Sequence, residues 1–141
     1  MNRRERSQVL AAASAEEVGH LAGIIQAGHE VRILKEPQKT LVMVKVRESV
    51  KRSLFYLGEV LATECMVIVD DAKGASVMAG DDFEKCIAMA VIDGYFNLPD
   101  AEDRVQIEAE IEALGKAQKK AREALNRELR RSKVNFNVMG E

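Results

Sequence analysis

The chain has 141 residues, of which 47% are hydrophobic and 31% charged, and its formal net charge is −2. This length suits one domain with its own core, and the composition and near-neutral charge exclude a disordered chain and give no reason to expect nucleic acid or an anionic membrane as partner. There is no apolar run near the roughly 20 residues of a bilayer span, no secretory signal pattern, and only two cysteines, so we expect a cytoplasmic protein without disulfides.

Residues 1–28 are predicted to form a helical hairpin. Asn2 is followed three residues later by Glu5, and Ser14 by Glu17, and each pair can form a capping box at a helix start. Apolar residues at helical spacing in the second segment give it one apolar face. The expected helices cover residues 3–13 and 15–27.

Residues 29–80 change to a period of two, which predicts an antiparallel sheet of about four strands. Pro37 is expected to end the first strand, because proline cannot donate to a strand ladder. Gly58 is expected to mark a bend or bulge in an unusually long third strand. The predicted strands are residues 29–35, 41–47, 54–69 and 75–79.

Residues 81–132 are predicted to be helical, with a break around Pro99. The last helix, residues 101–132, is too long for a domain of this size to cover. Its charges are sorted, since residues 100–112 carry six acidic groups and one basic group, whereas residues 116–133 carry eight basic and two acidic groups. A break near Gly115 that makes two antiparallel helices stays open as an alternative.

Residues 133–141 return to a period of two, with Val134, Phe136 and Val138 on one side. A chain end has no reason to alternate apolar residues unless it docks somewhere, so we expect a strand-like tail that binds a partner through these three side chains. The whole chain is therefore predicted to be one α+β domain with a helical hairpin (1–28), a sheet (29–80), helices (81–132) and a docking tail (133–141).

No pattern in the sequence predicts a catalytic or metal site. The two histidines have no Cys or His partner at metal-ligand spacing, there is no glycine-rich phosphate loop, and Cys65 and Cys86 fit small core positions. Arg47 lies in a basic cluster with Lys51 and Arg52 at a strand end, where its guanidinium could hold a phosphonate or phosphate or could simply be solvated.

The sequence resembles the PhnG family, which supplies one component of the bacterial carbon–phosphorus lyase core complex, over nearly its whole length. Residues 55–65 are the most specific part of this resemblance. The other similar stretches are residues 3–10, 40–47, 80–82 and 131–136, with Met139.

The resemblance implies a cytoplasmic complex with the H, I and J subunits of that enzyme, among which the I subunit is the most direct partner. In that complex an alkylphosphonate is joined to the ribose of ATP with loss of adenine, and a radical iron–sulfur subunit later cleaves the carbon–phosphorus bond. We therefore expect an accessory subunit that binds no cofactor or metal alone, with ATP a substrate of the complex. The chain is not expected to catalyse a reaction by itself.

The main alternative is a homo-oligomeric α+β binding module without an enzymatic role. An isolated subunit is also expected to expose apolar surface and to be able to dimerise.

Overall fold

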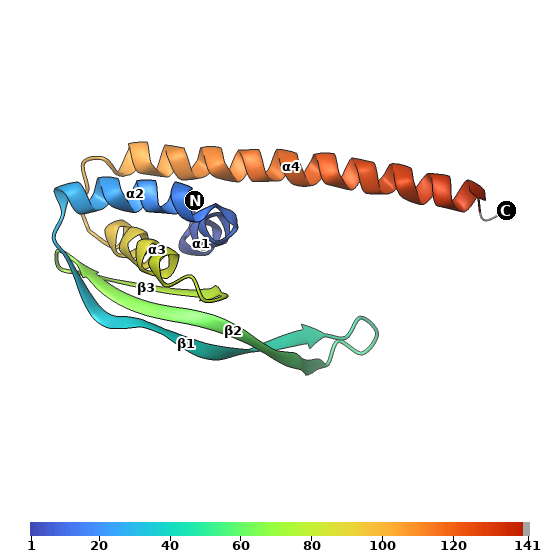
Figure 1. Ribbon diagram of the computed structural model, residues 1–141, viewed down its shortest axis with the longest axis horizontal. Helices are drawn as coiled ribbons and strands as arrows, with labels where there is room; N and C mark the ends of the chain where they lie inside the picture. Colours follow the sequence, from blue (N-terminus) through green and yellow to red (C-terminus); the bar gives the residue numbers. More distant parts are fainter. Residues whose placement is uncertain (140–141) are drawn as a thin grey trace.

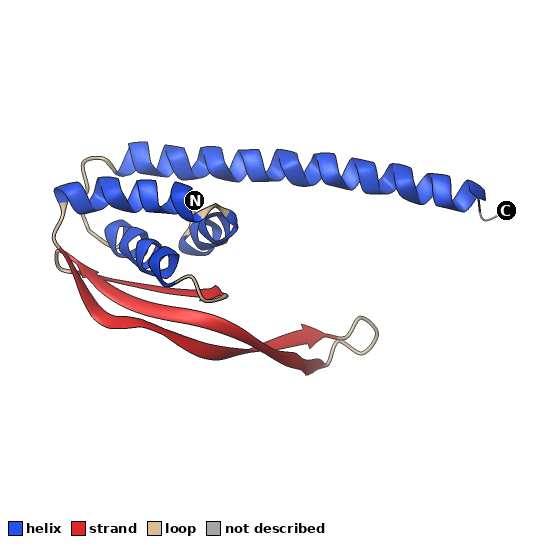
Figure 2. Cartoon of the chain, in the orientation of Figure 1, coloured by secondary structure: helices blue, strands red, loops and turns tan. Residues whose placement is uncertain are grey.

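The computed structural model describes the backbone of residues 1–139 and the side chains of residues 1–132. The fold is α+β, with a three-stranded antiparallel sheet whose one face is covered by helices (Figures 1 and 2). The elements in chain order are α1 (Arg3–Ala12), α2 (Ala15–Gly28), β1 (Val31–Arg47), β2 (Leu54–Val69), β3 (Ala72–Ala79), α3 (Phe83–Phe96) and α4 (Arg104–Met139).

Both predicted capping boxes are present at the starts of α1 and α2. The Glu5 and Glu17 amides donate to the side chains of Asn2 and Ser14 at 2.8 and 3.1 Å, and each glutamate accepts from the cap residue's own amide. These bonds satisfy amides that a helix start leaves without partners, which explains why both boundaries could be read from the sequence.

The sheet has the order β1-β2-β3, so the prediction of about four strands was one too many. Pro37 does not end a strand, because β1 runs through it. The register of β1 against β2 shifts between Lys35 and Gln38, which leaves residues 36 and 37 outside the ladder. An edge strand tolerates proline at such an irregularity, since no ladder hydrogen bond is required there.

The expected irregularity at Gly58 is confirmed. Val44 is opposite Gly58 but Lys45 is opposite Tyr56, so Leu57 is the extra residue of a bulge in β2. β3 pairs only with the second half of β2, from Ala62 onward. The first half of β2 and the end of β1 therefore extend past β3 as a two-stranded ribbon (Figure 1).

α3 lies directly on β3 because two glycines meet between them. A Cβ added to Gly74 would lie 2.1 Å from the Ala90 carbonyl oxygen, and one added to Gly94 would lie 3.3 Å from the Gly74 Cα. The core around this contact includes Tyr95 and Val67, both fully buried, and draws side chains from α1, α2, β2, α3 and α4.

α4 is one continuous helix, so the alternative with a break near Gly115 is wrong. Gly115 instead lies where α4 crosses α1, with a Val9 methyl 3.2 Å from the place its Cβ would occupy. The Gln118 side-chain amide donates to the Val9 carbonyl at 2.9 Å just beyond the crossing. The glycine thus permits a close helix approach, which outweighs its intrinsic cost to the helix.

The strand-like tail is also a wrong prediction, since residues 133–139 continue α4 as helix. Adding residues to an existing helix is easy once it is nucleated, whereas a strand needs an edge to pair with. The alternation of Val134, Phe136 and Val138 was too short a pattern to overcome this. Residues 140–141 of the expected tail lie outside the described residues.

Candidate interaction surface

Two parts of the chain project from the helix-covered body in the same direction (Figure 1). We call residues 41–61 the hairpin arm and residues 116–132 the helical arm. Both expose large apolar side chains that nothing in the described chain covers. In the hairpin arm these are Leu41, Val42, Met43, Val50, Leu54, Phe55, Tyr56, Leu57, Val60 and Leu61, and in the helical arm Leu125 and Leu129.

The helical arm continues the face of α4 that packs on the body. Ile107 and Ile111 are buried in the core, and Leu125 and Leu129 lie about five helical turns further along the same face. They are 55% and 58% exposed because the body ends near Gln118. An apolar stripe that leaves its own core in this way is typical of a helix that packs against another chain.

The hairpin arm is apolar on both sides of the ribbon. Leu61 lies on the face of β2 that α3 covers further along, and it pairs with Leu41, which shares that face. Val60 pairs with Val42 on the opposite face. Since a two-stranded ribbon in water has no core of its own, this arm lacks the packing that usually stabilises a sheet.

Charge is divided between the arms and the body. The two arms together carry eleven Lys and Arg residues against four Asp and Glu residues, whereas residues 1–40 and 62–115 carry nine against eighteen. The arms are therefore basic and the body acidic. No helix in the described chain has a stretch apolar enough to cross a bilayer.

Arg47 lies at the end of β1, in the turn of the hairpin arm. Its Nη1 donates to the Arg52 carbonyl at 2.9 Å, and Arg52 has a left-handed backbone with φ 55°. Arg47 therefore helps to hold the turn, and its suggested contact with substrate stays a prediction. Val134, Phe136 and Val138 lie in the last turns of α4, and their role as partner anchors also stays a prediction.

Inside the body, a buried carboxylate that the sequence analysis missed ties three elements together. Asp93 on α3 accepts two hydrogen bonds from the Arg3 guanidinium, at 2.8 and 2.7 Å, and a third from the Ala75 amide at 2.9 Å. The hydrogen bonds and the charge of Asp93 raise the pKa of Arg3. The available signal was a lone carboxylate in the apolar run of α3, where an unpaired charge would be costly.

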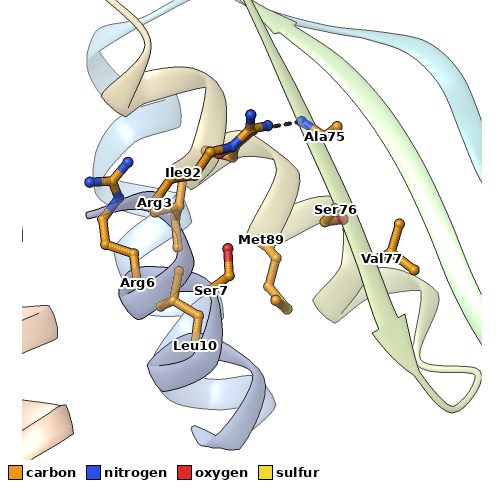
Figure 3. A pocket seen from close by; sticks show the side chains of 10 residues that line it. Arg3, Arg6, Ser7, Leu10, Ala75, Ser76, Val77, Met89 and Ile92 are labelled. Carbon is orange, nitrogen blue, oxygen red and sulfur yellow. Dashed lines mark hydrogen bonds and ion pairs between the residues drawn. The ribbon is translucent and has the colours of Figure 1, made fainter. Parts of the chain in front are cut away.

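A pocket of about 240 Å³ lies beside this ion pair, between α1, β3 and α3 (Figure 3). Arg3 reaches across it toward Ala75, while Arg6 points away and lies over the Phe96 ring at 4.2 Å. The polar groups of Asp93 are already used by the fold, and the remaining wall is mostly apolar, with Leu10, Met89 and Ile92. The arrangement is a structural joint between three elements.

A second joint connects the end of α2 to the turn between β2 and β3. His29 Nδ1 lies 2.7 Å from an Asp70 carboxylate oxygen, and the Glu30 amide donates to the other oxygen at 2.9 Å. These bonds lower the pKa of Asp70, chiefly through His29. The His29 ring also meets the Tyr95 ring edge-on at 5.5 Å.

Cys65 and Cys86 are buried, as the sequence predicted. Burial raises the pKa of Cys65 to about 11 and raises that of Cys86 as well, so both thiols stay protonated and unreactive at neutral pH. Within the described residues, no three His, Cys, Asp or Glu side chains are grouped to hold a metal ion.

The family model "Phosphonate metabolism protein PhnG" matches residues 1–140 of the chain. No curated protein sequence matches it significantly.

Proposed function

The chain belongs to the PhnG family of phosphonate metabolism proteins, and from this we propose that it is an accessory subunit of a carbon–phosphorus lyase core complex. In that role it supports the transfer of an alkylphosphonate to the ribose of ATP with loss of adenine. The observation that carries the proposal is the pair of arms, which expose apolar side chains that the described part of this chain does not cover.

The proposed partners are the H, I and J subunits of the complex, with the I subunit contacting this chain most directly. Apolar arms of this kind suit a subunit that is buried within an assembly, because each large apolar side chain transferred from water contributes about 1.5–3 kcal/mol. The chemistry is assigned to the partners, and ATP is a substrate of the complex that this chain does not bind alone. The protonated thiols and structurally used carboxylate of the body support this division.

The direct test is co-purification of the I subunit with three forms of this chain: full length, ending at residue 132, and ending at residue 118. We expect the shortest form to lose the partner, because it lacks the exposed stripe with Leu125 and Leu129. If the form ending at 132 retains the partner fully, then Val134, Phe136 and Val138 are not anchors. Retention by all three forms would contradict a role for the helical arm.

The suggested substrate contact of Arg47 is tested in the reconstituted complex. Arg47→Ala should raise the KM for the triphosphate substrate at unchanged complex assembly, since guanidinium groups bind phosphate oxygens. Arg32→Ala is the matched control, because Arg32 is an exposed arginine of the same strand outside the arm. Equal turnover by both variants would leave Arg47 with its role in the turn alone.

The alternative function is a homo-oligomeric binding module without an enzyme partner. It predicts a stable oligomer of the isolated chain that ignores the other components of the complex, and phosphonate utilisation that survives deletion of its gene. We favour the accessory role in the complex because of the family membership.

A further inference from the structure

The edges of the sheet differ in how they are closed to another strand. At the outer edge of β3, two backbone groups are already used, since Asp93 accepts the Ala75 amide at 2.9 Å and the Asn97 side-chain amide donates to the Lys73 carbonyl at 2.8 Å. A strand added there would have to displace both hydrogen bonds. The edge around residues 73–75 is therefore occupied by the body itself.

The outer edge of β1 is open but carries several features that discourage pairing. Pro37 lacks an amide hydrogen, the register shifts twice between Ile33 and Gln38, and Lys35 and Lys39 add charge. Irregularities, proline and lysine are the common means by which edge strands avoid association.

The first half of β2 has a free edge with fewer of these features. β3 leaves the sheet at Gly80, where φ is +96°, and the Gly80 amide donates to the Leu61 carbonyl at 3.0 Å. Within the described residues, this is the last bond that β2 makes on that side. Residues 54–60 thus have β1 on one side and an edge without a strand partner on the other, with one bulge at Leu57 and no proline or lysine.

We propose that residues 54–61 pair antiparallel with the same residues of a second copy of this chain. The segment is complementary to itself about a two-fold axis between Leu57 and Gly58. Leu54 would face Leu61 of the other copy, Phe55 would face Val60, and Tyr56 would face Glu59. No like charges are opposed, and apolar or aromatic pairs of this kind stabilise antiparallel strands.

Charge complementarity supports a second copy as the occupant. The added strand lies in line with β3, so its hairpin turn reaches the point where β3 of the other copy ends. That turn carries Lys51 and Arg52, and β3 is followed by Asp81 and Asp82. Because the dimer is two-fold symmetric, this contact between basic and acidic residues occurs twice.

The same axis also reverses the direction of α4. Because the helical arm projects in the same direction as the hairpin arm (Figure 1), the axis directs the basic half of each α4 toward the acidic body of the other copy. Both the strand register and the overall charge division therefore favour the same arrangement.

The first experiment measures the mass of the purified full-length chain by sedimentation over a range of concentrations. The same measurement is made on variants in which charges at the proposed contact are reversed. We expect a dimer whose Kd rises with salt. Lys51→Glu should weaken it at least about tenfold, Asp81→Lys should do likewise, and the double variant should regain most of the affinity. Lys39→Glu, with the same charge change on β1, is the matched control and should not weaken the dimer.

A second variant addresses the strand edge itself. Leu61 directs its carbonyl toward the β3 side, so Glu59, two residues earlier, directs its amide to the same open side. Glu59→Pro should remove this donor without removing a bond to β1, and should give a folded monomer by circular dichroism. If this variant does not fold, the charge-reversal variants alone test the proposed dimer.

A full-length chain that stays monomeric up to about 100 μM would overturn the proposal. A dimer that is unaffected by Lys51→Glu, Asp81→Lys and Glu59→Pro would overturn it as well. The measurement uses this chain alone, so its outcome is independent of whether the I subunit binds.

Discussion

At the scale of single residues, Gly74 on β3 and Gly94 on α3 make a close backbone contact in the body. The space beside Gly74 is occupied by backbone atoms of α3, which cannot rotate away as a side chain could. Any side chain there must push the helix off the sheet.

Gly74→Ala should therefore lower the free energy of unfolding by about 1–3 kcal/mol or more, as overpacking a core does. Urea denaturation followed by circular dichroism measures this. Gly23→Ala is the control, because Gly23 lies within α2 with nothing within 4 Å of an added Cβ, and it should stabilise by about 0.5–1 kcal/mol. Equal effects of the two substitutions would contradict the close contact.

The hydrogen bonds of Asp70 make the stability of the fold depend on pH. Its pKa is lowered in the folded chain, chiefly by the hydrogen bond with His29. A carboxylate of this kind stabilises the fold above its unfolded pKa of about 4, and the contribution is lost as the pH falls through the lower folded pKa.

Asp70→Asn should therefore reduce the loss of stability between about pH 5 and pH 2.5, measured by urea denaturation at each pH. Asparagine also tolerates the left-handed backbone of residue 70, where φ is 51°. Asp71→Asn is the matched control, since Asp71 takes part in neither hydrogen bond of the joint. An identical acid profile for wild type and Asp70→Asn would contradict the assignment.

The sequence predicted residues with local functions better than those with distant partners. The capping pairs Asn2/Glu5 and Ser14/Glu17 are three residues apart, so both partners were visible in the chain. Asp93 bonds to Arg3 and Ala75, 90 and 18 residues away, and no local pattern indicates these partners. The same holds for Gly115, whose neighbour Val9 is on another helix.

At the scale of elements, α4 consists of a part that packs and a part that does not. The first part buries Ile107 and Ile111, while beyond Gln118 the side chains through residue 132 are exposed. The stability of the body should therefore not depend on the helical arm.

Ending the chain at residue 121 should change the free energy of unfolding by less than about 0.5 kcal/mol, which is typical of surface changes. Amide hydrogen exchange of the full chain should show rapid exchange beyond residue 121, because an isolated helix of this length is marginal in water. Ending the chain at residue 110 is the control, and it should destabilise strongly by removing Ile111 from the core. A large loss from the first truncation would show that the arm packs on its own body.

Helices and β2 were predicted well at this scale, and β1 and the chain end were not. The periods of two and 3.6 depend only on neighbouring residues, and the bulge at Leu57 was indicated by the adjacent Gly58 within an apolar strand. Whether Pro37 ends a strand depends on whether that strand lies at an edge, which is a property of the whole sheet. The arms were expected only in part, since the length of α4 was clear but the projection of the hairpin was not.

At the scale of the whole molecule, the arms carry most of the exposed large apolar side chains of the described residues, although the body also exposes some, such as Leu34, Val77 and Val105. The isolated chain should therefore bind an apolar dye such as anilinonaphthalene sulfonate while still folded. Dye fluorescence should fall when the I subunit is added, because under the proposed function that subunit covers the arms. The form ending at residue 118 is the control and should bind less dye from the start, and unchanged fluorescence on mixing would contradict coverage of these surfaces.

The blocked edge of β3 also limits how far any association through the sheet can proceed. With the β3 edge occupied at residues 73–75 and β1 irregular, residues 54–60 are the most open place for strand addition in the described part of the chain, and a two-fold pairing there uses up this edge in both copies. Although its ribbon is apolar, the chain should therefore form closed dimers and not open-ended fibrils, even in the absence of any other protein.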